Sequence, residues 1–561
     1  MNRPVQWIAT LPLLLIPCCW LWWWAAGLNP GVEIGRSADL LLCVGCGAAM
    51  WAVRGATIPL ATLPLLFALA WQALALLWAP VREPGVVWLI ERAAACASSL
   101  ALARWCATAE TPRLIAAAAI CGSGLLVLTC LTQIPDLGAW LRVHREAPFG
   151  NVNFTVGAAL PLAALGIARF LHTGSRRWWL YAIATAGCAG ALAKGWLGGD
   201  PCQAVWLGGA AAITSALILR LPGRWHGPLL LAGAAALLVA WVIPVAGWTE
   251  PPGSGAGTAQ RVHIWRASIE SLAGPALLIG HGPAAIITVL PDQPSFAALW
   301  LTVPSYAAHA HAEPLQILCD GGLVLAGLLV WALVITLRPL WRRRDEPAMA
   351  ALLVAWCTAG TLALIESHLS QPGGLLCLAL LGGLSWAAAG ENLAITVPVP
   401  LRVTLPLLGA AALAMLMGRE LAADGGGPVG IEARSQRHQG GDPAAELADL
   451  DLLRRRLGPL DDLDLRRAYD LGRLGRLAES DAALIAHMDR NPAQAAGLAL
   501  ARRRIASGQA PAALVAAAAA ARQRAAALRL SITRNPVNGA ALDALAAELS
   551  RGTDDGPAPT R

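Results

Sequence analysis

Long apolar runs separated by short polar segments make up most of the chain between residues 7 and 418. The runs are about 17–24 residues long, which is enough for an α-helix to cross the hydrocarbon core of a bilayer. The pattern predicts an all-α fold, a polytopic membrane helix bundle of about 13 spans. The predicted spans lie near residues 7–28, 38–53, 59–79, 87–104, 114–133, 151–168, 179–198, 203–219, 228–248, 314–337, 348–366, 374–390 and 403–418.

The composition agrees with this pattern. Hydrophobic residues account for 57% of the chain and charged residues for 14%, whereas soluble domains contain about 25% charged residues. These proportions exclude an ordinary soluble globular protein. The first apolar run, residues 7–28, is too long for the apolar region of a cleaved signal peptide, so we expect a retained helix. The net charge of +7 comes almost entirely from arginine. Membrane proteins concentrate arginine in cytoplasmic loops, so this charge does not indicate nucleic-acid binding.

Arginines in the short loops predict the orientation of the bundle. They concentrate in alternate loops, most densely in "RPLWRRRDE" at residues 338–346. Because cytoplasmic loops carry the excess of positive charge, this segment is expected inside. The long segment 249–313 and the region after residue 421 are then expected on the outer face. We therefore predict a multi-pass protein of the bacterial inner (cytoplasmic) membrane with an extracytoplasmic C-terminal domain.

The C-terminal region differs in composition from the bundle. We assign residues 1–420 to the bundle, including the outer loop 249–313, and residues 421–440 to a linker. Residues 441–550 show helical periodicity, and the tail 551–561 is expected to be disordered. Within the helical part, Asp442 followed by Pro443 is typical of a helix start. The stretch "AYDLGRLGRLAES" resembles a tetratricopeptide helix pair, although a plain helical domain explains it equally well.

The outer segment contains most of the candidate chemistry. In "TAQRVHIWRASIESL", a helix capped by Thr258 would place Arg261, Trp265 and Leu272 along one side. This pattern predicts an amphipathic helix at the bilayer surface with Trp265 at headgroup depth. The stretch "SYAAHAHAEPLQILCDGG", residues 305–322, then places ionisable residues at the mouth of the next span. Ionisable residues at membrane depth are functional candidates.

Two pieces of sequence resemble the O-antigen ligase and polymerase superfamily. The first is "RVHIWRASIESLAGPALLIGHGP" followed by "HAHAEPLQILCDGG", and the second is "FGNVNFTVGAALPL", residues 149–162. The family has a His-Asn-acidic-x-Leu-Gln element, which His311, Glu313 and Gln316 match. Its Gly-Asn-x-Asn element is matched by the piece that contains Asn151 and Asn153.

The sequence departs from the family pattern at two places. Ala312 stands where the family has an asparagine after the histidine. The family's Ser-Arg-Gly element is also missing, and the matching stretch "LAKGWLGGDPCQAVWLG" offers Lys194 as its cation. Both departures bear on whether a site with two cations is retained.

The resemblance implies glycan transfer at the outer face of the membrane. The donor would be a glycan linked to undecaprenyl pyrophosphate. The acceptor would be a hydroxyl of a lipid, a glycan or a protein, and the partners would include membrane lipids but no nucleic acid. The membrane glycosyltransferase fold of this family implies no cofactor and no metal. His309 and His311 together with His281 and Glu313 could bind zinc, but the sequence shows no further tight cluster of ligands.

The residue types suit this reaction. Arg261 offers a permanent cation with several donors for the oxygens of a leaving pyrophosphate. His311 is a side chain that can accept the proton of an acceptor hydroxyl near neutral pH. Arg261 and His311 are therefore the predicted catalytic residues. The predicted substrate-binding residues are Glu313, Lys194, Arg142, Arg145, Asn151, Asn153, Gln316 and His309.

Other interpretations remain open for these residues. Arg261 could be an interfacial side chain that reaches for water, and His311 and Glu313 could serve only to cap the next helix. Glu91 and Arg92 adjoin a predicted span and could bind the carrier, or could only pair with other groups. Glu366 and His368 lie at the outer end of another span and could face the same cavity. The functional alternatives are a repeat-unit polymerase, a transporter of lipid-linked glycans and a non-catalytic scaffold. No internal repeat typical of a transporter is found.

Overall fold

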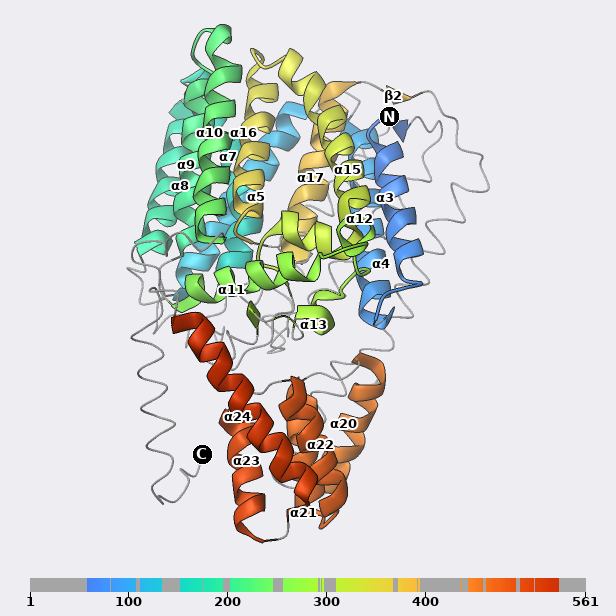
Figure 1. The fold of residues 1–561 in the computed structure, drawn as a ribbon. Coiled ribbons are helices and arrows are strands. Elements are labelled where there is room, and N and C mark those ends of the chain that lie inside the picture. Colours follow the sequence, from blue (N-terminus) through green and yellow to red (C-terminus); the bar gives the residue numbers. More distant parts are fainter. Residues whose placement is uncertain are drawn as a thin grey trace.

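A computed structural model describes the helices of the bundle and of the C-terminal region (Figure 1). The described residues are 58–80, 82–106, 111–133, 152–174, 176–194, 202–245, 256–290, 293, 295–296, 309–366, 372–390, 392–393, 435, 442–457, 461–490, 495–508 and 510–533. The predicted spans 7–28, 38–53 and 403–418, the linker apart from Ser435, and the tail lie outside these residues.

The remaining predicted spans coincide with helices. The bundle helices are α3 (Thr62–Ala75), α4 (Arg82–Cys106), α5 (Thr111–Gln133), α7 (Val152–Thr173), α8 (Arg176–Lys194), α9 (Gln203–Ile218), α10 (His226–Val245), α15 (Glu313–Arg342), α16 (Pro347–Ala363) and α17 (Pro372–Ala389). Among the described residues, three stretches are long and apolar enough to cross a membrane, namely Thr111–Leu131 in α5, Thr155–Thr173 in α7 and Glu313–Arg342 in α15. A short antiparallel pair, β1 (Ile58–Pro59) with β2 (Asn392–Leu393), joins two distant segments.

Small residues let the central helices approach closely. α7 packs against α5, α9, α16 and α17. A Cβ at Gly122 of α5 would lie 2.5 Å from the backbone nitrogen of Ala163 in α7. A Cβ at Gly383 of α17 would lie 2.8 Å from the carbonyl oxygen of Ser99 in α4. Close backbone contact through small residues is how helices associate in lipid, where apolar burial supplies little driving force.

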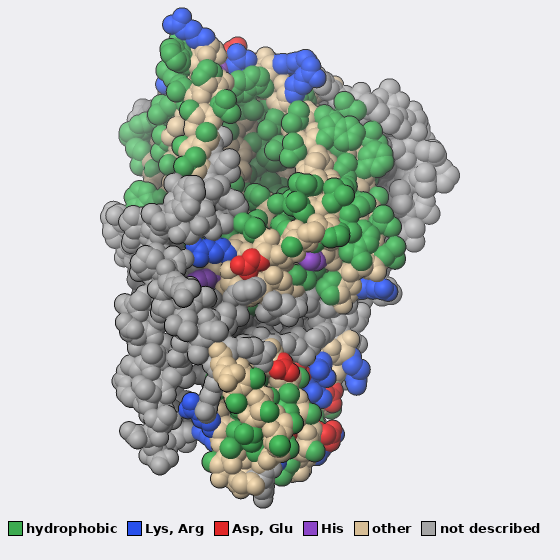
Figure 2. All heavy atoms as spheres, in the orientation of Figure 1, with side chains coloured by type: hydrophobic (Ala, Val, Ile, Leu, Met, Phe, Trp, Pro, Cys, Tyr) green, Lys and Arg blue, Asp and Glu red, His purple; other side chains and the backbone are tan. Residues whose placement is uncertain are grey.

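Polar surfaces lie at the two ends of the bundle. The short helices α11 (Ala256–Ser271), α12 (Ala276–Ile279) and α13 (Ile286–Val289) lie across one end, with the C-terminal helices beyond them (Figure 1). Blue arginine side chains gather at the opposite end, and hydrophobic side chains cover much of the flank between the ends (Figure 2). The arginine-rich end includes the turn between α15 and α16, with Arg343 and Arg344. Arg344 reaches His226 at the start of α10 with an N–N distance of 2.9 Å.

α15 is broken where it meets the loop after α12. Gly322 has φ 65° and ψ −163°, so the backbone leaves the helical conformation. The carbonyl oxygens of Cys319 and Asp320 accept hydrogen bonds from the backbone N–H groups of His281 (2.7 Å) and Gly282 (3.1 Å). Backbone groups freed by a break at membrane depth need such partners, because hydrocarbon offers none.

Glycines bring these two segments together. A Cβ at Gly280 would lie 2.5 Å from the backbone nitrogen of Gly321, and a Cβ at Gly322 would lie 2.2 Å from the carbonyl oxygen of Leu278. The indole N–H of Trp71 in α3 donates to the carbonyl oxygen of Gly321 at 2.8 Å. The glycines of "IGHG" and "CDGG" thus serve one backbone contact, which holds the segment after α11 against the first part of α15.

The C-terminal helices pack against one another around an apolar core. They are α20 (Pro443–Leu457), α21 (Asp461–Arg473), α22 (Leu477–Arg490), α23 (Ala495–Ala506) and α24 (Ala512–Thr533). The predicted cap is confirmed, because Asp442 Oδ1 accepts the N–H groups of Ala444 (3.1 Å) and Ala445 (3.0 Å). A left-handed Gly475, with φ 72°, follows α21 and allows the sharp turn into α22.

Asp470 makes the stability of this helical part depend on pH. Burial and the neighbouring Glu446 together raise the pKa of Asp470 to about 6, while Arg473 opposes the shift. The raised pKa favours the protonated carboxyl in the folded state. The contribution of Asp470 to stability is therefore greatest below pH 4, and it falls as the pH rises towards 6.

We expect Asp470→Asn to stabilise the helical part at pH 7.5 by about 1–2 kcal/mol, with little effect at pH 4. The amide removes the buried charge and its repulsion with Glu446. Pulse proteolysis of the full-length protein in urea at both pH values measures the difference. A loss of stability at pH 7.5 would contradict the role given to Asp470.

Candidate functional site

A tight turn at the start of α15 presents His311. The residue has φ 49°, a left-handed conformation that costs free energy in a non-glycine residue unless its surroundings hold it. The indole N–H of Trp265 in α11 donates to the carbonyl oxygen of His311 at 3.2 Å. Ala312 is extended and precedes the helix, and Pro314 occupies its first turn. The strained backbone is therefore held from one side by α11.

Arg261 and His311 both contact one carboxylate. An Nη nitrogen of Arg261, on α11, forms an ion pair with one oxygen of Glu366, just after the end of α16. Nδ1 of His311 lies 3.3 Å from the other oxygen of Glu366. The Glu366 side chain is 1% exposed, whereas those of Arg261 and His311 are 20% and 28% exposed. We call these residues the Arg–Glu–His cluster; in it a buried anion positions two partly accessible groups.

A second network holds the other side of the turn. The backbone N–H of Ala310 donates to Gln316 Oε1 at 2.9 Å. Gln316 Nε2 in turn donates to Asp320 Oδ1 at 3.0 Å, and Arg92 of α4 donates to Asp320 Oδ2 at 2.9 Å. Asp320 and Gln316 are fully buried. Because a buried charge requires a partner, the pair of Arg92 and Asp320 fixes α4 to α15 directly below the turn.

An aromatic stack closes this network into a ring. The guanidinium of Arg92 lies 4.9 Å from the centre of the Trp88 ring. The ring of Trp88 stacks on His309, with centroids 5.6 Å apart and an interplanar angle of 23°. His309 is the residue before Ala310, so the contacts lead back to the turn that carries His311.

The structure brings several of the predicted site residues together. His309, His311 and Gln316 belong to the turn and the first part of α15 described above. Glu313, at the first position of α15, is buried with 4% of its surface exposed. Asn153 lies in the first turn of α7, and Lys194 is the last residue of α8. Arg142, Arg145 and Asn151 lie outside the described residues.

The surroundings of Trp265 differ from those predicted. The predicted helix is present but begins at Ala256, two residues before Thr258. Arg261, Trp265 and Leu272 do lie towards one side, but that side contacts protein. Trp265 is 5% exposed and packs in a core with Leu272 and Leu315, so it does not stand free at headgroup depth. The apolar face of α11 covers the start of α15.

Other site residues did not enter the predicted set. Arg92 and Glu366 were weighed as a possible carrier-binding residue and a possible cavity residue, but neither was placed in the predicted site. Asp320 and Trp88 were not singled out. Asp320 had a usable signal, since an acidic residue inside the apolar run "LQILCDGGLVLAG" is costly in a membrane and marks a functional or structural contact. Trp88 lies in an ordinary apolar stretch, and its sequence gives no comparable signal.

The described residues contain no group of three or more His, Cys, Asp or Glu side chains placed as metal ligands. No family model matches the chain, and no curated protein matches its sequence. Function is therefore inferred from the residues and their geometry.

Proposed function

We propose that this chain is a membrane glycan ligase of the O-antigen ligase type. It would transfer a glycan from undecaprenyl pyrophosphate to a hydroxyl of a lipid, a glycan or a protein. The observation that carries the proposal is that Arg261 and His311, a cation for the leaving group and a base for the acceptor, meet at the same buried carboxylate. These residues are far apart in the sequence, and both were predicted from the family resemblance together with the chemistry of their side chains.

Arg261 supports departure of the pyrophosphate. As the bond between the sugar C1 and the phosphate oxygen breaks, its electron pair stays on that oxygen, and negative charge grows there. The guanidinium has several N–H donors in a plane, and the ion pair with Glu366 holds it in place. A fixed cation lowers the barrier because it need not reorganise as the charge develops.

His311 supports attack by the acceptor. A carboxylate beside Nδ1 keeps a proton on that nitrogen, so that Nε2 carries the free electron pair. Nε2 then takes the proton of the acceptor hydroxyl as its oxygen bonds to C1. The proton passes to solvent after the reaction. Glu366 thus orients both groups and takes no part in the bond changes itself.

The proposed setting follows from the charge pattern. With the arginine-rich end of the bundle in the cytoplasm of the bacterial inner membrane, the Arg–Glu–His cluster faces the outer side. About 13 spans then leave the C-terminal helices on that side as well. α20 contacts α4, whose Arg92 belongs to the network beside the cluster. An acceptor bound by the helical part would therefore lie near the site.

Carrier analysis in cells that lack the gene tests the function. We expect full-length glycan to accumulate on undecaprenyl pyrophosphate, and the wild-type chain to clear it. His311→Asn should clear it at least about 100-fold more slowly, the loss typical of a missing general base. Intact-carrier mass spectrometry measures both. Accumulation of single repeat units would indicate a polymerase, and unchanged carriers would overturn the proposal.

A further inference from the structure

Three helix ends meet on the arginine-rich side of the bundle. α7 ends at Thr173, α8 begins at Arg176 and α9 ends at Ile218, and the three helices pack against one another. The chain then turns into α10, whose His226 contacts Arg344 of the turn between α15 and α16. This α7–α8–α9 junction therefore lies at the end of the bundle opposite α11 and the Arg–Glu–His cluster (Figure 1).

Two arginines and a histidine gather at the junction. His172, in the last turn of α7, has its Nδ1 3.3 Å from the carbonyl oxygen of Ala168. Arg220, in the turn after α9, lies within electrostatic range of the His172 ring. Arg169, one turn before His172, places its guanidinium 5.5 Å from the centre of the Trp178 ring. The junction thus carries two permanent cations at the ends of neighbouring helices.

The two arginines have no carboxylate partner. Within the part of the chain that the structure describes, neither Arg169 nor Arg220 forms an ion pair, and the buried Nε of Arg169 has no hydrogen-bond partner. A buried donor without a partner is rare in a native structure and indicates a missing acceptor. Arg220 is exposed, so its guanidinium can reach the same acceptor from the surface.

Helix dipoles do not neutralise the junction. The C-termini of α7 and α9 each carry about half a negative charge, and the N-terminus of α8 carries about half a positive charge. The three ends together offset only about half of one positive charge. Arg169 and Arg220 contribute two, so an excess of about one and a half positive charges remains. This excess suits a phosphate group with a single negative charge, to which arginine donates well.

An exposed apolar stripe on α9 leads to Arg220. Trp206, Ala210, Ile213 and Leu217 are exposed and recur every three or four residues, so they lie on one face of the helix. Arg220 continues this face three residues after Leu217. At 1.5 Å per residue, Trp206 and Leu217 are about 16 Å apart along α9. Half of the hydrocarbon core of a bilayer is about 15 Å thick, so the stripe matches an acyl chain of one leaflet.

We propose that the α7–α8–α9 junction binds an anionic phospholipid of the leaflet at the arginine-rich end. The phosphate accepts hydrogen bonds from Arg220 and Arg169, and an acyl chain lies along the stripe on α9. Trp178, beside Arg169, occupies the depth at which tryptophan rings border the headgroups. The cations alone would suit any anion, and the stripe is what selects a lipid. This binding is independent of the proposed function, since no residue of the Arg–Glu–His cluster takes part in it.

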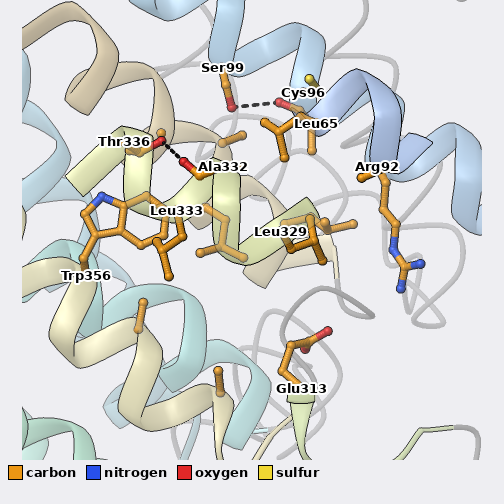
Figure 3. A pocket seen from close by; sticks show the side chains of 18 of the residues that line it. Leu65, Arg92, Cys96, Ser99, Glu313, Leu329, Ala332, Leu333, Thr336 and Trp356 are labelled. Atoms are coloured by element: carbon orange, nitrogen blue, oxygen red, sulfur yellow. Dashed lines mark hydrogen bonds between the residues drawn. The ribbon is translucent and has the colours of Figure 1, made fainter. Parts of the chain in front are cut away.

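The bundle offers a second apolar space that the test must distinguish. A cavity of about 490 Å³ lies among α3, α4, α15, α16 and α17, with Leu329, Leu333 and Trp356 in its lining (Figure 3). Its lining includes no residue of the α7–α8–α9 junction, so a lipid held there would not depend on Arg220. Gly360 lines the cavity, and a Cβ at this position meets no atom within 4 Å. Gly360→Trp therefore fills the cavity and leaves the junction unchanged.

Native mass spectrometry of the full chain from nanodiscs, with phosphatidylglycerol as the probe, tests the site. We expect Arg220→Gln to weaken binding about fivefold, the size expected for one arginine at an anionic headgroup, and Arg220→Lys to keep most of the binding. Arg169→Gln/Arg220→Gln should weaken it at least about tenfold. Arg338→Gln, exposed in the last turns of α15 at the same end, is the matched control and should change binding less than about twofold, as should Gly360→Trp. Equal losses in Arg220→Gln and Arg338→Gln would overturn the proposal.

Two further measurements test the choice of ligand. Phosphatidylethanolamine with the same acyl chains has no net charge and should bind at least about fivefold more weakly than phosphatidylglycerol. Equal binding of the two lipids would contradict the role of the arginines. Glycerol 3-phosphate in large excess should not displace phosphatidylglycerol, because it has no chain to lie along α9. Displacement would show a site for soluble anions and overturn the assignment to a lipid.

Discussion

Arg261→Gln is expected to slow glycan transfer about 100- to 1000-fold, the loss typical of removing one preorganised donor at a developing negative charge. The amide N–H of the glutamine can still donate a hydrogen bond to Glu366, so the variant keeps part of the contact made by the guanidinium. The loss should appear mainly in kcat, because the charge on the pyrophosphate grows as the bond breaks. Transfer from a synthetic polyprenyl-pyrophosphate glycan in proteoliposomes measures kcat and KM.

Arg266→Gln is the matched control for this prediction. Arg266 lies on the same helix but does not belong to the Arg–Glu–His cluster, so its loss should change the rate less than about threefold. Arg261→Lys should recover part of the rate, since the charge is kept and the planar set of donors is lost. Equal rates for Arg261→Gln and the wild type would remove Arg261 from the mechanism.

The positions of the bundle helices could be predicted from the sequence, because the length of each apolar run is enough to locate a helix. α5, for example, occupies Thr111–Gln133 where the apolar run predicted 114–133. The break in α15 could not be predicted in the same way. Gly321 and Gly322 indicate a flexible backbone, but the break depends on the contact with Gly280, about 40 residues earlier in the chain.

Trp265 illustrates a second limit. Helical periodicity shows which residues share a face, and it placed Arg261 and Trp265 correctly on one side of α11. Periodicity does not show what covers that face, because lipid and protein both favour apolar side chains. In the folded chain this face is covered by protein and not by lipid, and Trp265 is buried against the turn of His311.

The candidate site could be predicted only in part for the same reason. His311 and Gln316 lie close in sequence, so one motif predicts both. Glu366 contacts Arg261, which is 105 residues away in the sequence, and His311, which is 55 residues away. No local pattern links residues at such separations, and the carboxylate could be recognised only as an ionisable residue near the end of a span.

Glu366→Gln tests whether this carboxylate positions His311 for the reaction. The amide has nearly the same shape, so the turn at α15 should be preserved while the negative charge is lost. Without a carboxylate beside Nδ1, the imidazole is held less firmly in the tautomer that leaves Nε2 free. We expect transfer at pH 7.5 to fall about 10- to 100-fold, the size seen when such orienting partners are removed.

The split between kcat and KM separates positioning from a purely structural ion pair. A misoriented imidazole slows proton transfer after the substrate has bound, so Glu366→Gln should lower kcat and change KM less than about threefold. Loss of structure at the site would raise KM as well. Glu346→Gln, at the opposite end of α16, is the control, because Glu346 pairs with Arg343 and is half exposed. A raised KM with an unchanged kcat in Glu366→Gln would reduce Glu366 to a structural anchor for α11.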